Sequence, residues 1–277
     1  MGDVMKVIKK TIPYLILGIL ALFVIFPVLW MFVSSFKGLN EIYAPEIVWF
    51  PSEIKWGNYI DVLKETFIVR SFWNSLKISL PPVVVGVLTS AMAGFAFAKL
   101  NFAGKNILFT ALFSTIVIPG IVTMIPSYLL FNAYGWLDTL LPLIIPGMCG
   151  SITIMFFLRQ YISGLPTELM DAAIIDGLSY GGVFFRIYLP LSKPAIITQL
   201  ILAFNGAYND YMGPVLYIND EKNQTVQIVL NSFISEYAAN WQYMLAGSVL
   251  ALLPTLLIYI FAQKYFVEGI AHTGLKA

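Results

Sequence analysis

The chain has 277 residues, of which 59% are hydrophobic and 11% charged, with a mean hydropathy of +0.81 and a formal net charge of +1. Soluble domains carry about 25% charged residues, so this composition indicates an integral membrane protein. The near-neutral charge and the lack of a basic run argue against a nucleic-acid partner. A single cysteine excludes an internal disulfide and a cysteine-based metal cluster.

A transmembrane helix needs about 20 apolar residues, and six stretches of the sequence meet this requirement. In chain order they are 11–36, 78–98, 106–137, 139–158, 194–218 and 237–263. The third run is longer than one span, so we expect its helix to end near Phe131, and we place the sixth helix near 243–264. Prolines at 119, 126, 142 and 146 predict kinks in the third and fourth helices. The predicted fold class is all-α, a polytopic membrane protein with six transmembrane helices.

Polar segments between these runs divide the chain into four parts. Residues 1–36 hold the N-terminal tail and first helix, 37–71 an extracytoplasmic loop, 72–266 the other five helices with a loop at 163–193, and 267–277 a C-terminal tail. Basic residues favour the cytoplasmic side of a membrane. If the N-terminus is inside, ten of the 16 Lys and Arg lie on inner segments and six on outer ones. Both termini and the 163–193 loop are therefore expected in the cytoplasm.

The connection between the fourth and fifth runs is patterned as two short helices joined by a glycine. Four residues fall at i, i+3, i+4 and i+7, on one face of the first helix: Leu169, Ala172, Ala173 and Asp176. Gly177 can take the positive φ that ends a helix, and Ser179 is positioned to cap the second helix. The two alanines would let another surface approach closely. The sequence therefore predicts that this pair of helices within the 163–193 loop, called the elbow below, docks onto a partner.

The alternative for this connection is an amphipathic helix lying flat on the membrane surface. Such a helix favours Lys and Arg on its polar face, whereas Glu168, Asp171 and Asp176 are acidic. The charge pattern therefore favours docking to a protein.

The elbow resembles the EAA loop of ABC importer permeases, written E-A-A-x-x-x-G, nine residues, then I-x-L-P. Here the motif runs from Asp171-Ala172-Ala173 through Gly177 to Ile187-x-Leu189-Pro190, with Asp171 in place of the usual Glu. The flanking sequences resemble the carbohydrate branch of that family, the relatives of the maltose permease subunits. They are Phe157-Leu158-Arg159-Gln160, Tyr208-Asn209-Asp210 and Phe266-Val267-x-Gly269.

This resemblance implies the architecture of a type I ABC importer permease, working by alternating access in a bacterial or archaeal plasma membrane. The residues that it implies for coupling to an ATPase are Glu168, Asp171, Ala172, Ala173, Asp176, Gly177, Ile187 and Pro190. The implied partners are membrane lipid, a different second permease subunit, two cytoplasmic ATPase subunits and an external solute-binding protein. That protein would contact the last outer loop, 219–241, and the substrate would be a sugar or oligosaccharide.

The chain lacks the sequence of a phosphate-binding loop, G-x-x-x-x-G-K-[ST]. Its only Gly-Lys pair, Gly104-Lys105, is followed by Asn106 and has no glycine at the required earlier position. We therefore expect no cofactor and no enzymatic site in this chain, with ATP and Mg bound by the partner ATPase subunits.

The fifth run carries polar residues that are candidates for lining a translocation pathway: Asn205, Tyr208, Asn209 and Asp210. Asn205 and Asn209 are one helical turn apart and share a face. An ionisable residue within a span is costly in lipid and is a functional candidate for that reason. Two structural alternatives stay open, namely hydrogen bonds between helices and a position of Asp210 at the outer water boundary.

Two rival functions fit the sequence less well. An ion-coupled secondary transporter is expected to carry several intramembrane carboxylates, and only Asp210 is available. An intramembrane enzyme needs a nucleophile with a base, or a metal cluster, and the only histidine, His272, lies in the C-terminal tail.

Overall fold

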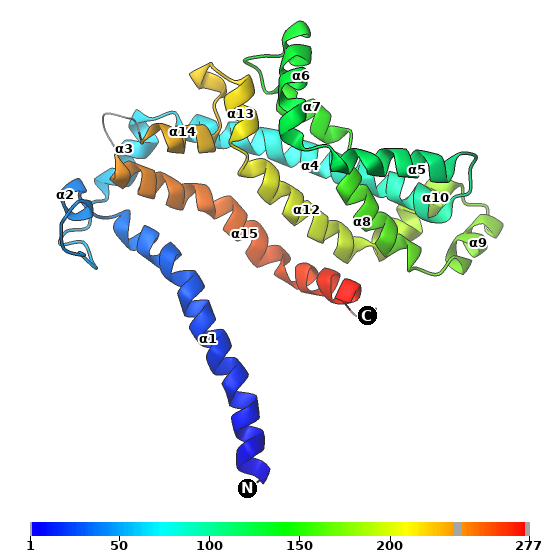
Figure 1. Ribbon diagram of the computed structural model, residues 1–277, viewed down its shortest axis with the longest axis horizontal. Helices are drawn as coiled ribbons and strands as arrows, with labels where there is room; N and C mark the ends of the chain where they lie inside the picture. Colours follow the sequence, from blue (N-terminus) through cyan, green and yellow to red (C-terminus); the bar gives the residue numbers. More distant parts are fainter. Residues whose placement is uncertain (1, 235–239, 275–277) are drawn as a thin grey trace. The chain divides into compact units, whose positions relative to one another are not determined.

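The computed structural model describes the backbone of residues 2–234 and 240–274, and these residues fold predominantly into helices (Figure 1). Residues 235–239 of the predicted last outer loop and 275–277 of the predicted tail lie outside the described residues. Four helices are long and apolar enough to cross a membrane: Thr11–Ser34, Ile68–Lys99, Leu141–Ser163 and Trp241–Lys264. Two bent pairs raise the number to six if each pair is one span, namely Lys105–Val117 with Gly120–Ala133 and Tyr180–Leu191 with Lys193–Tyr208. The predicted all-α membrane fold is confirmed.

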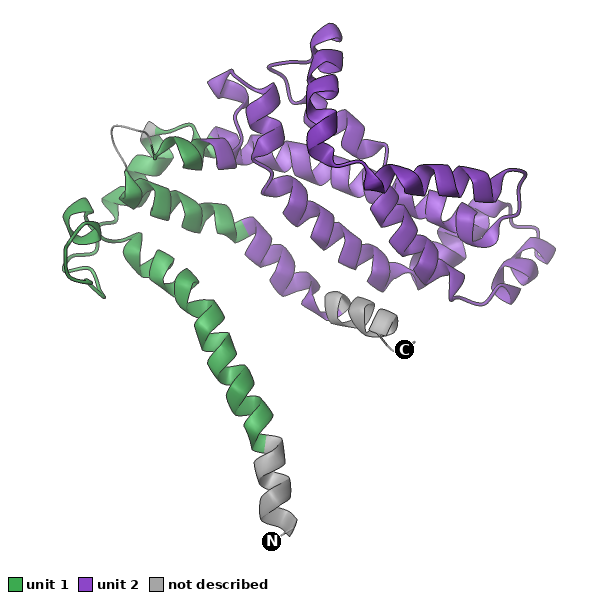
Figure 2. Ribbon diagram, in the orientation of Figure 1, with its two compact units in different colours: residues 1–69, 229–253 green, residues 70–228, 254–277 purple. Residues whose placement is uncertain are grey.

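The chain forms two compact units, coloured separately in Figure 2. Unit 1 comprises residues 1–69 and 229–253, and unit 2 comprises residues 70–228 and 254–277. Three helices begin in one unit and end in the other: α4 (Ile68–Lys99), α14 (Val226–Ser232) and α15 (Trp241–Gly274).

Unit 1 holds α1 (Gly2–Ser34), α2 (Leu39–Ile42) and α3 (Gly57–Glu65). The side chain of Lys37, just past α1, is buried. Its Nζ donates to the carbonyl of Val48 at 2.6 Å and to Oγ of Ser34 at 3.0 Å. It also lies 3.9 Å from the centre of the Trp30 ring, a cation–π contact. These contacts fold the 38–56 segment back against the end of α1.

In unit 2, α4 packs against α7 (Leu141–Met148) and α8 (Ile152–Ser163) with close backbone approach. A Cβ on Gly86 would overlap the carbonyl oxygen of Gly147, and one on Gly94 would lie 3.1 Å from the carbonyl oxygen of Met155. Small residues permit such contact between membrane helices. Gly94 therefore fixes the distance of α4 from α8, the helix that leads into the elbow.

The fourth predicted helix is broken between α7 and α8, where Gly150 has a φ of +96°. Residue Ser90 of α4 satisfies the freed backbone, because its Oγ accepts from the Ser151 amide at 2.8 Å. The third predicted helix is also broken. Its halves, α5 (Lys105–Ser114) with its short extension to Val117 and α6 (Gly120–Ala133), meet at 98° beside Pro119.

The second predicted helix begins at Ile68, ten residues before its apolar run. The added turns carry polar side chains that are buried, Ser71, Asn74 and Ser75. Asn74 Nδ2 donates to the carbonyls of Lys222 and Gln224, at 2.9 and 3.1 Å, and Ser75 Oγ accepts from the amide of Val226 at 3.0 Å. Hydropathy alone missed these turns because their side chains are polar, and those of Asn74 and Ser75 bond to another segment of the fold.

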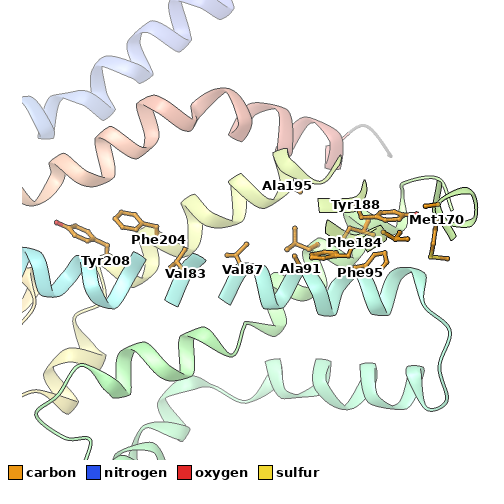
Figure 3. Packing of buried hydrophobic residues seen from close by; sticks show 14 residues of the cluster. Val83, Val87, Ala91, Phe95, Met170, Phe184, Tyr188, Ala195, Phe204 and Tyr208 are labelled. Atoms are coloured by element: carbon orange, nitrogen blue, oxygen red, sulfur yellow. The ribbon is translucent and has the colours of Figure 1, made fainter. Parts of the chain in front are cut away.

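The hydrophobic core of unit 2 joins α4 to α12 (Lys193–Tyr208) and to the elbow (Figure 3). Val83, Val87, Ala91 and Phe95 follow one side of α4. Phe204 and Tyr208 of α12 pack at one end of this cluster, and Phe184, Tyr188 and Met170 of the elbow at the other. The cluster thus connects the elbow with α4 and α12.

Candidate functional site: the elbow and the polar face of α12

The first helix of the elbow is α9 (Glu168–Ile175), which ends in a glycine turn. Gly177 has a φ of +87°. Its amide donates to Ile174 O at 3.0 Å, and the amide of Leu178 donates to Ala173 O at 2.9 Å. These two bonds form a Schellman motif, which satisfies carbonyls that the helix end leaves free. The predicted positive φ at Gly177 is confirmed.

The second helix, α10 (Tyr180–Val183), begins as the sequence predicts, because Ser179 Oγ accepts from the amide of Gly182 at 3.3 Å. It runs into a π-helix, Phe184–Tyr188, and a last short turn, α11 (Leu189–Leu191). Wide turns of this kind occur often at functional sites. The sequence analysis missed the π-helix, although Pro190, which has no N–H to continue a regular ladder, was a signal for it.

The exposed surface of α9 differs from the predicted face at one position. Leu169, Ala172 and Asp176 are exposed, but Ala173 is buried in the core of unit 2 together with Met170. Successive residues of a helix are rotated by about 100°, so Ala172 and Ala173 cannot both face fully outward. The outward-facing surface of α9 therefore includes Ile175 in place of Ala173. Ile175 is the most exposed large apolar residue of the elbow, at 85%.

The acidic residues and the I-x-L-P segment lie around this surface. Glu168, Asp171 and Asp176 are exposed, as is Pro190, while Ile187 packs against the core. From α9 to α11 the elbow thus presents apolar side chains beside three carboxylates, and Arg186 is the exposed basic residue there. Such a surface suits a protein groove better than an anionic lipid surface.

The predicted pathway residues of α12 divide into two groups. Asn205 and Asn209 are exposed and bonded, since Asn209 Nδ2 donates to Oδ1 of Asn205 at 2.9 Å. Gln227 Nε2 donates to Asn209 Oδ1 at 3.1 Å. Gln227 extends this polar face, and the sequence analysis missed it because it lies 18 residues further along the chain.

Tyr208 is not part of that face, because its ring lies in the core of unit 2. It is 1% exposed, stacks on Phe204 at 5.3 Å and meets the edge of Phe72 at 6.5 Å. Asp210 lies in the break after α12 and not within a helix. Its Oδ1 accepts from the amide of Gly213 at 3.3 Å, in the first turn of α13 (Met212–Tyr217).

A second ordered feature of unit 2 is the turn at Asp138, a non-glycine residue with positive φ (59°). Its Oδ1 accepts from the amides of Asn219 and Asp220, and its amide donates to Tyr217 O at 2.9 Å. These hydrogen bonds hold the pKa of the Asp138 carboxyl below its usual value. Among the described residues, no three His, Cys, Asp or Glu side chains gather as a metal site would require.

Comparisons with known proteins agree with this architecture. Residues 86–272 match the family model described as binding-protein-dependent transport system inner membrane component. The chain is 34% identical over 260 residues to the arabinooligosaccharides transport system permease protein AraQ of Halalkalibacterium halodurans, with 93% of each chain covered. It is 29% identical over 269 residues to the lactose transport system permease protein LacG of Rhizobium radiobacter, covering 96% of this chain and 97% of the relative.

Among solved structures, a chain of a bacterial ABC transporter involved in the import of the acidic polysaccharide alginate superposes with a TM-score of 0.81. The two chains are 21% identical, and the match covers 94% of this chain and 96% of the other. This similarity supports the fold.

Proposed function

Because the chain belongs to the family of binding-protein-dependent transport system inner membrane components, we propose that it is the permease subunit of an ATP-driven importer for a sugar or oligosaccharide. Its relatives include permease proteins named for arabinooligosaccharides and for lactose. The amide face of Asn205, Asn209 and Gln227 fits this substrate class, since amides donate to and accept from hydroxyl groups. The ion-coupled alternative is not supported by the family to which the chain belongs.

The elbow is the observation that supports ATP-driven coupling most directly. Its glycine turn is closed by two backbone bonds, so α9 presents a fixed apolar surface around Ile175. We propose that this surface seats in a cytoplasmic ATPase subunit and that Asp171, Ala172, Asp176, Gly177 and their neighbours form the contact. ATP and Mg would bind in two such subunits, and this chain would itself carry no ATPase site.

The remaining partners and the orientation follow from this assignment. A structure of the bacterial alginate transporter includes an alginate pentasaccharide-bound periplasmic protein, which supports a binding-protein partner for this chain. We propose in addition a second, different permease subunit and a plasma membrane location with both termini cytoplasmic. The loop held by Asp138 would then lie outside, toward the binding protein.

Uptake by the reconstituted complex tests this function. The chain, its partner permease, both ATPase subunits and the binding protein are placed in lipid vesicles and supplied with radiolabelled mono- and oligosaccharides. We expect uptake of one sugar class that requires both ATP and the binding protein. Uptake that depends on an ion gradient and not on ATP would contradict the proposal.

A further inference from the structure

Two polar side chains hold the short link between α8 and α9, which no part of the proposed function explains. Lys99 Nζ donates to Leu165 O at 2.6 Å and to Thr167 Oγ1 at 3.1 Å. Tyr188 Oη donates to Pro166 O at 2.9 Å. Three consecutive residues of the link, 165–167, are therefore each bonded to a side chain from elsewhere in unit 2.

The two donor side chains are buried, while the link that they bond to is partly exposed. Lys99 is 8% exposed and Tyr188 is fully buried, and the Lys99 ammonium lies 5.6 Å from the centre of the Tyr188 ring. Among the described residues, this ammonium has no carboxylate at ion-pair distance. A buried ammonium is costly unless its donors are satisfied, so it holds the Leu165 carbonyl and the Thr167 hydroxyl in place. An apolar side chain would fill the same space without fixing the link.

The two donors come from different helical segments. Lys99 is the last residue of α4, and Tyr188 is the last residue of the π-helix that leads through α11 into α12. The link itself joins α8 to α9. The ends of three membrane segments, α4, α8 and the bent segment ending in α12, thus meet at residues 165–167.

Apolar packing alone would connect these segments less rigidly. The rings of Phe95, Phe184 and Tyr188 lie beside one another at this end of the core (Figure 3). The centre of the Phe95 ring lies 5.5 Å from that of Phe184 and 5.1 Å from that of Tyr188. Ring contacts are non-directional compared with hydrogen bonds, which weaken steeply with angle. The three bonds therefore fix the position of residues 165–167 relative to Lys99 and Tyr188 more closely than ring packing would.

We propose that Lys99 and Tyr188 are positioning residues that tie the elbow to α4 and α12, so that displacement of α9 by an ATPase moves these segments together. This inference rests on the proposed function of the elbow. Without the tie, ATP hydrolysis would move α9 and α8 while α4 and α12 lag behind. The expected defect is therefore a loss of transport per ATP, with assembly of the complex retained.

The test compares uptake with ATP hydrolysis in the complete complex in vesicles. The variants are Lys99→Met, which keeps an unbranched side chain but removes the ammonium group, and Tyr188→Phe, which removes one oxygen. The matched control is Lys105→Met, because Lys105 Nζ donates at 2.7 Å to the Leu100 carbonyl and to no atom of the elbow link. Sugar uptake per ATP hydrolysed is measured at equal amounts of assembled complex, alongside hydrogen exchange of residues 164–170.

We expect both variants to assemble, to hydrolyse ATP, and to show uptake per ATP at least fivefold lower than wild type, with faster exchange in the link. Lys105→Met should match wild type. Wild-type coupling ratios in both Lys99→Met and Tyr188→Phe would overturn the inference while leaving the proposed function intact. A wild-type complex without ATP-driven uptake would overturn both. Should Lys99→Met not assemble, Tyr188→Phe decides the outcome alone.

Discussion

Single residues with positive φ shape the elbow and the turn at Asp138. A Cβ added to Gly177 would meet no atom within 4 Å, so the constraint at this position is the backbone conformation and not space. The left-handed region costs a residue with a Cβ about 1–2 kcal/mol, and a β-branched residue is a genuine outlier there. Asp138 accepts that conformation more readily than most residues, because its short side chain bonds locally.

The Asp138 turn should loosen only in acid. Its carboxyl has a lowered pKa in the folded chain, owing to the amides of Asn219 and Asp220. A carboxyl whose pKa is lower in the folded than in the unfolded chain stabilises the fold at pH values above its ordinary pKa of about 3.9. That stabilisation is lost as the pH falls through the pKa of the folded state. Amide protection at Asn219 and Asp220, corrected for intrinsic exchange, should be constant from about pH 5 to 8 and fall below about pH 4.

An Asp138→Asn variant provides the control for that measurement. Asparagine tolerates the left-handed region but does not ionise in this range. Its protection should be lower than that of wild type at neutral pH and should not change in acid. Equal protection of the wild-type loop at pH 3 and pH 7 would refute the role of the carboxylate.

Asn209 is the residue whose loss should affect the substrate most directly. Replacing it with Leu removes a donor and an acceptor from the polar face of α12. One hydrogen bond is worth about 0.5–1.5 kcal/mol, so we expect KM for uptake to rise roughly 2- to 10-fold. Asn101→Leu, in the exposed turn after α4, should leave KM unchanged. An unchanged KM in Asn209→Leu would remove this face from the pathway.

At the scale of elements, sequence reasoning succeeded where the signal is local. The glycine turn at Gly177 and the cap at Ser179 depend on neighbouring residues, and both are confirmed. The break at Gly150 was missed because the residue that supports it, Ser90, is 61 residues away in sequence. The burial of Tyr208 and the bonds of Lys99 were missed for the same reason, as they depend on which helices pack together.

The packing of α4 on α8 can be tested through its glycine contact. A Cβ on Gly94 would lie 3.0 Å from the amide nitrogen of Arg159 and 3.1 Å from Met155 O, both backbone atoms. Gly94→Ala should therefore destabilise the chain by about 1–3 kcal/mol, as overpacking does. Gly18→Ala is the matched control, since Gly18 in α1 has nothing within 4 Å.

The measurement is the apparent melting temperature of the purified chain in detergent. We expect Gly94→Ala to melt several degrees lower than wild type and Gly18→Ala to melt at or above it. If both variants melted together, the close approach of α4 and α8 would not be a determinant of stability.

At the scale of the whole molecule, the basic residues predict the orientation of the chain in the membrane, and labelling tests this prediction. Cys149 is the only cysteine and is exposed, so it is first changed to Ala. Single cysteines then replace Glu53, in the segment after α1, or Gly181, in the elbow, both of them exposed. A membrane-impermeant maleimide applied to intact cells should label position 53 and not position 181. The reverse pattern would place the elbow outside and exclude an ATPase partner for it.

Docking of the elbow to a cytoplasmic ATPase is the central claim, and co-purification tests it most directly. The tagged chain is extracted gently from its native membrane, and the proteins that accompany it are identified by mass, for wild type, Gly177→Val and the control Gly181→Ala. The wild type and Gly181→Ala should bring down an ATPase subunit and a second polytopic permease chain, whereas Gly177→Val should lose the ATPase. Recovery of the wild-type chain alone, or only with copies of itself, would contradict the account.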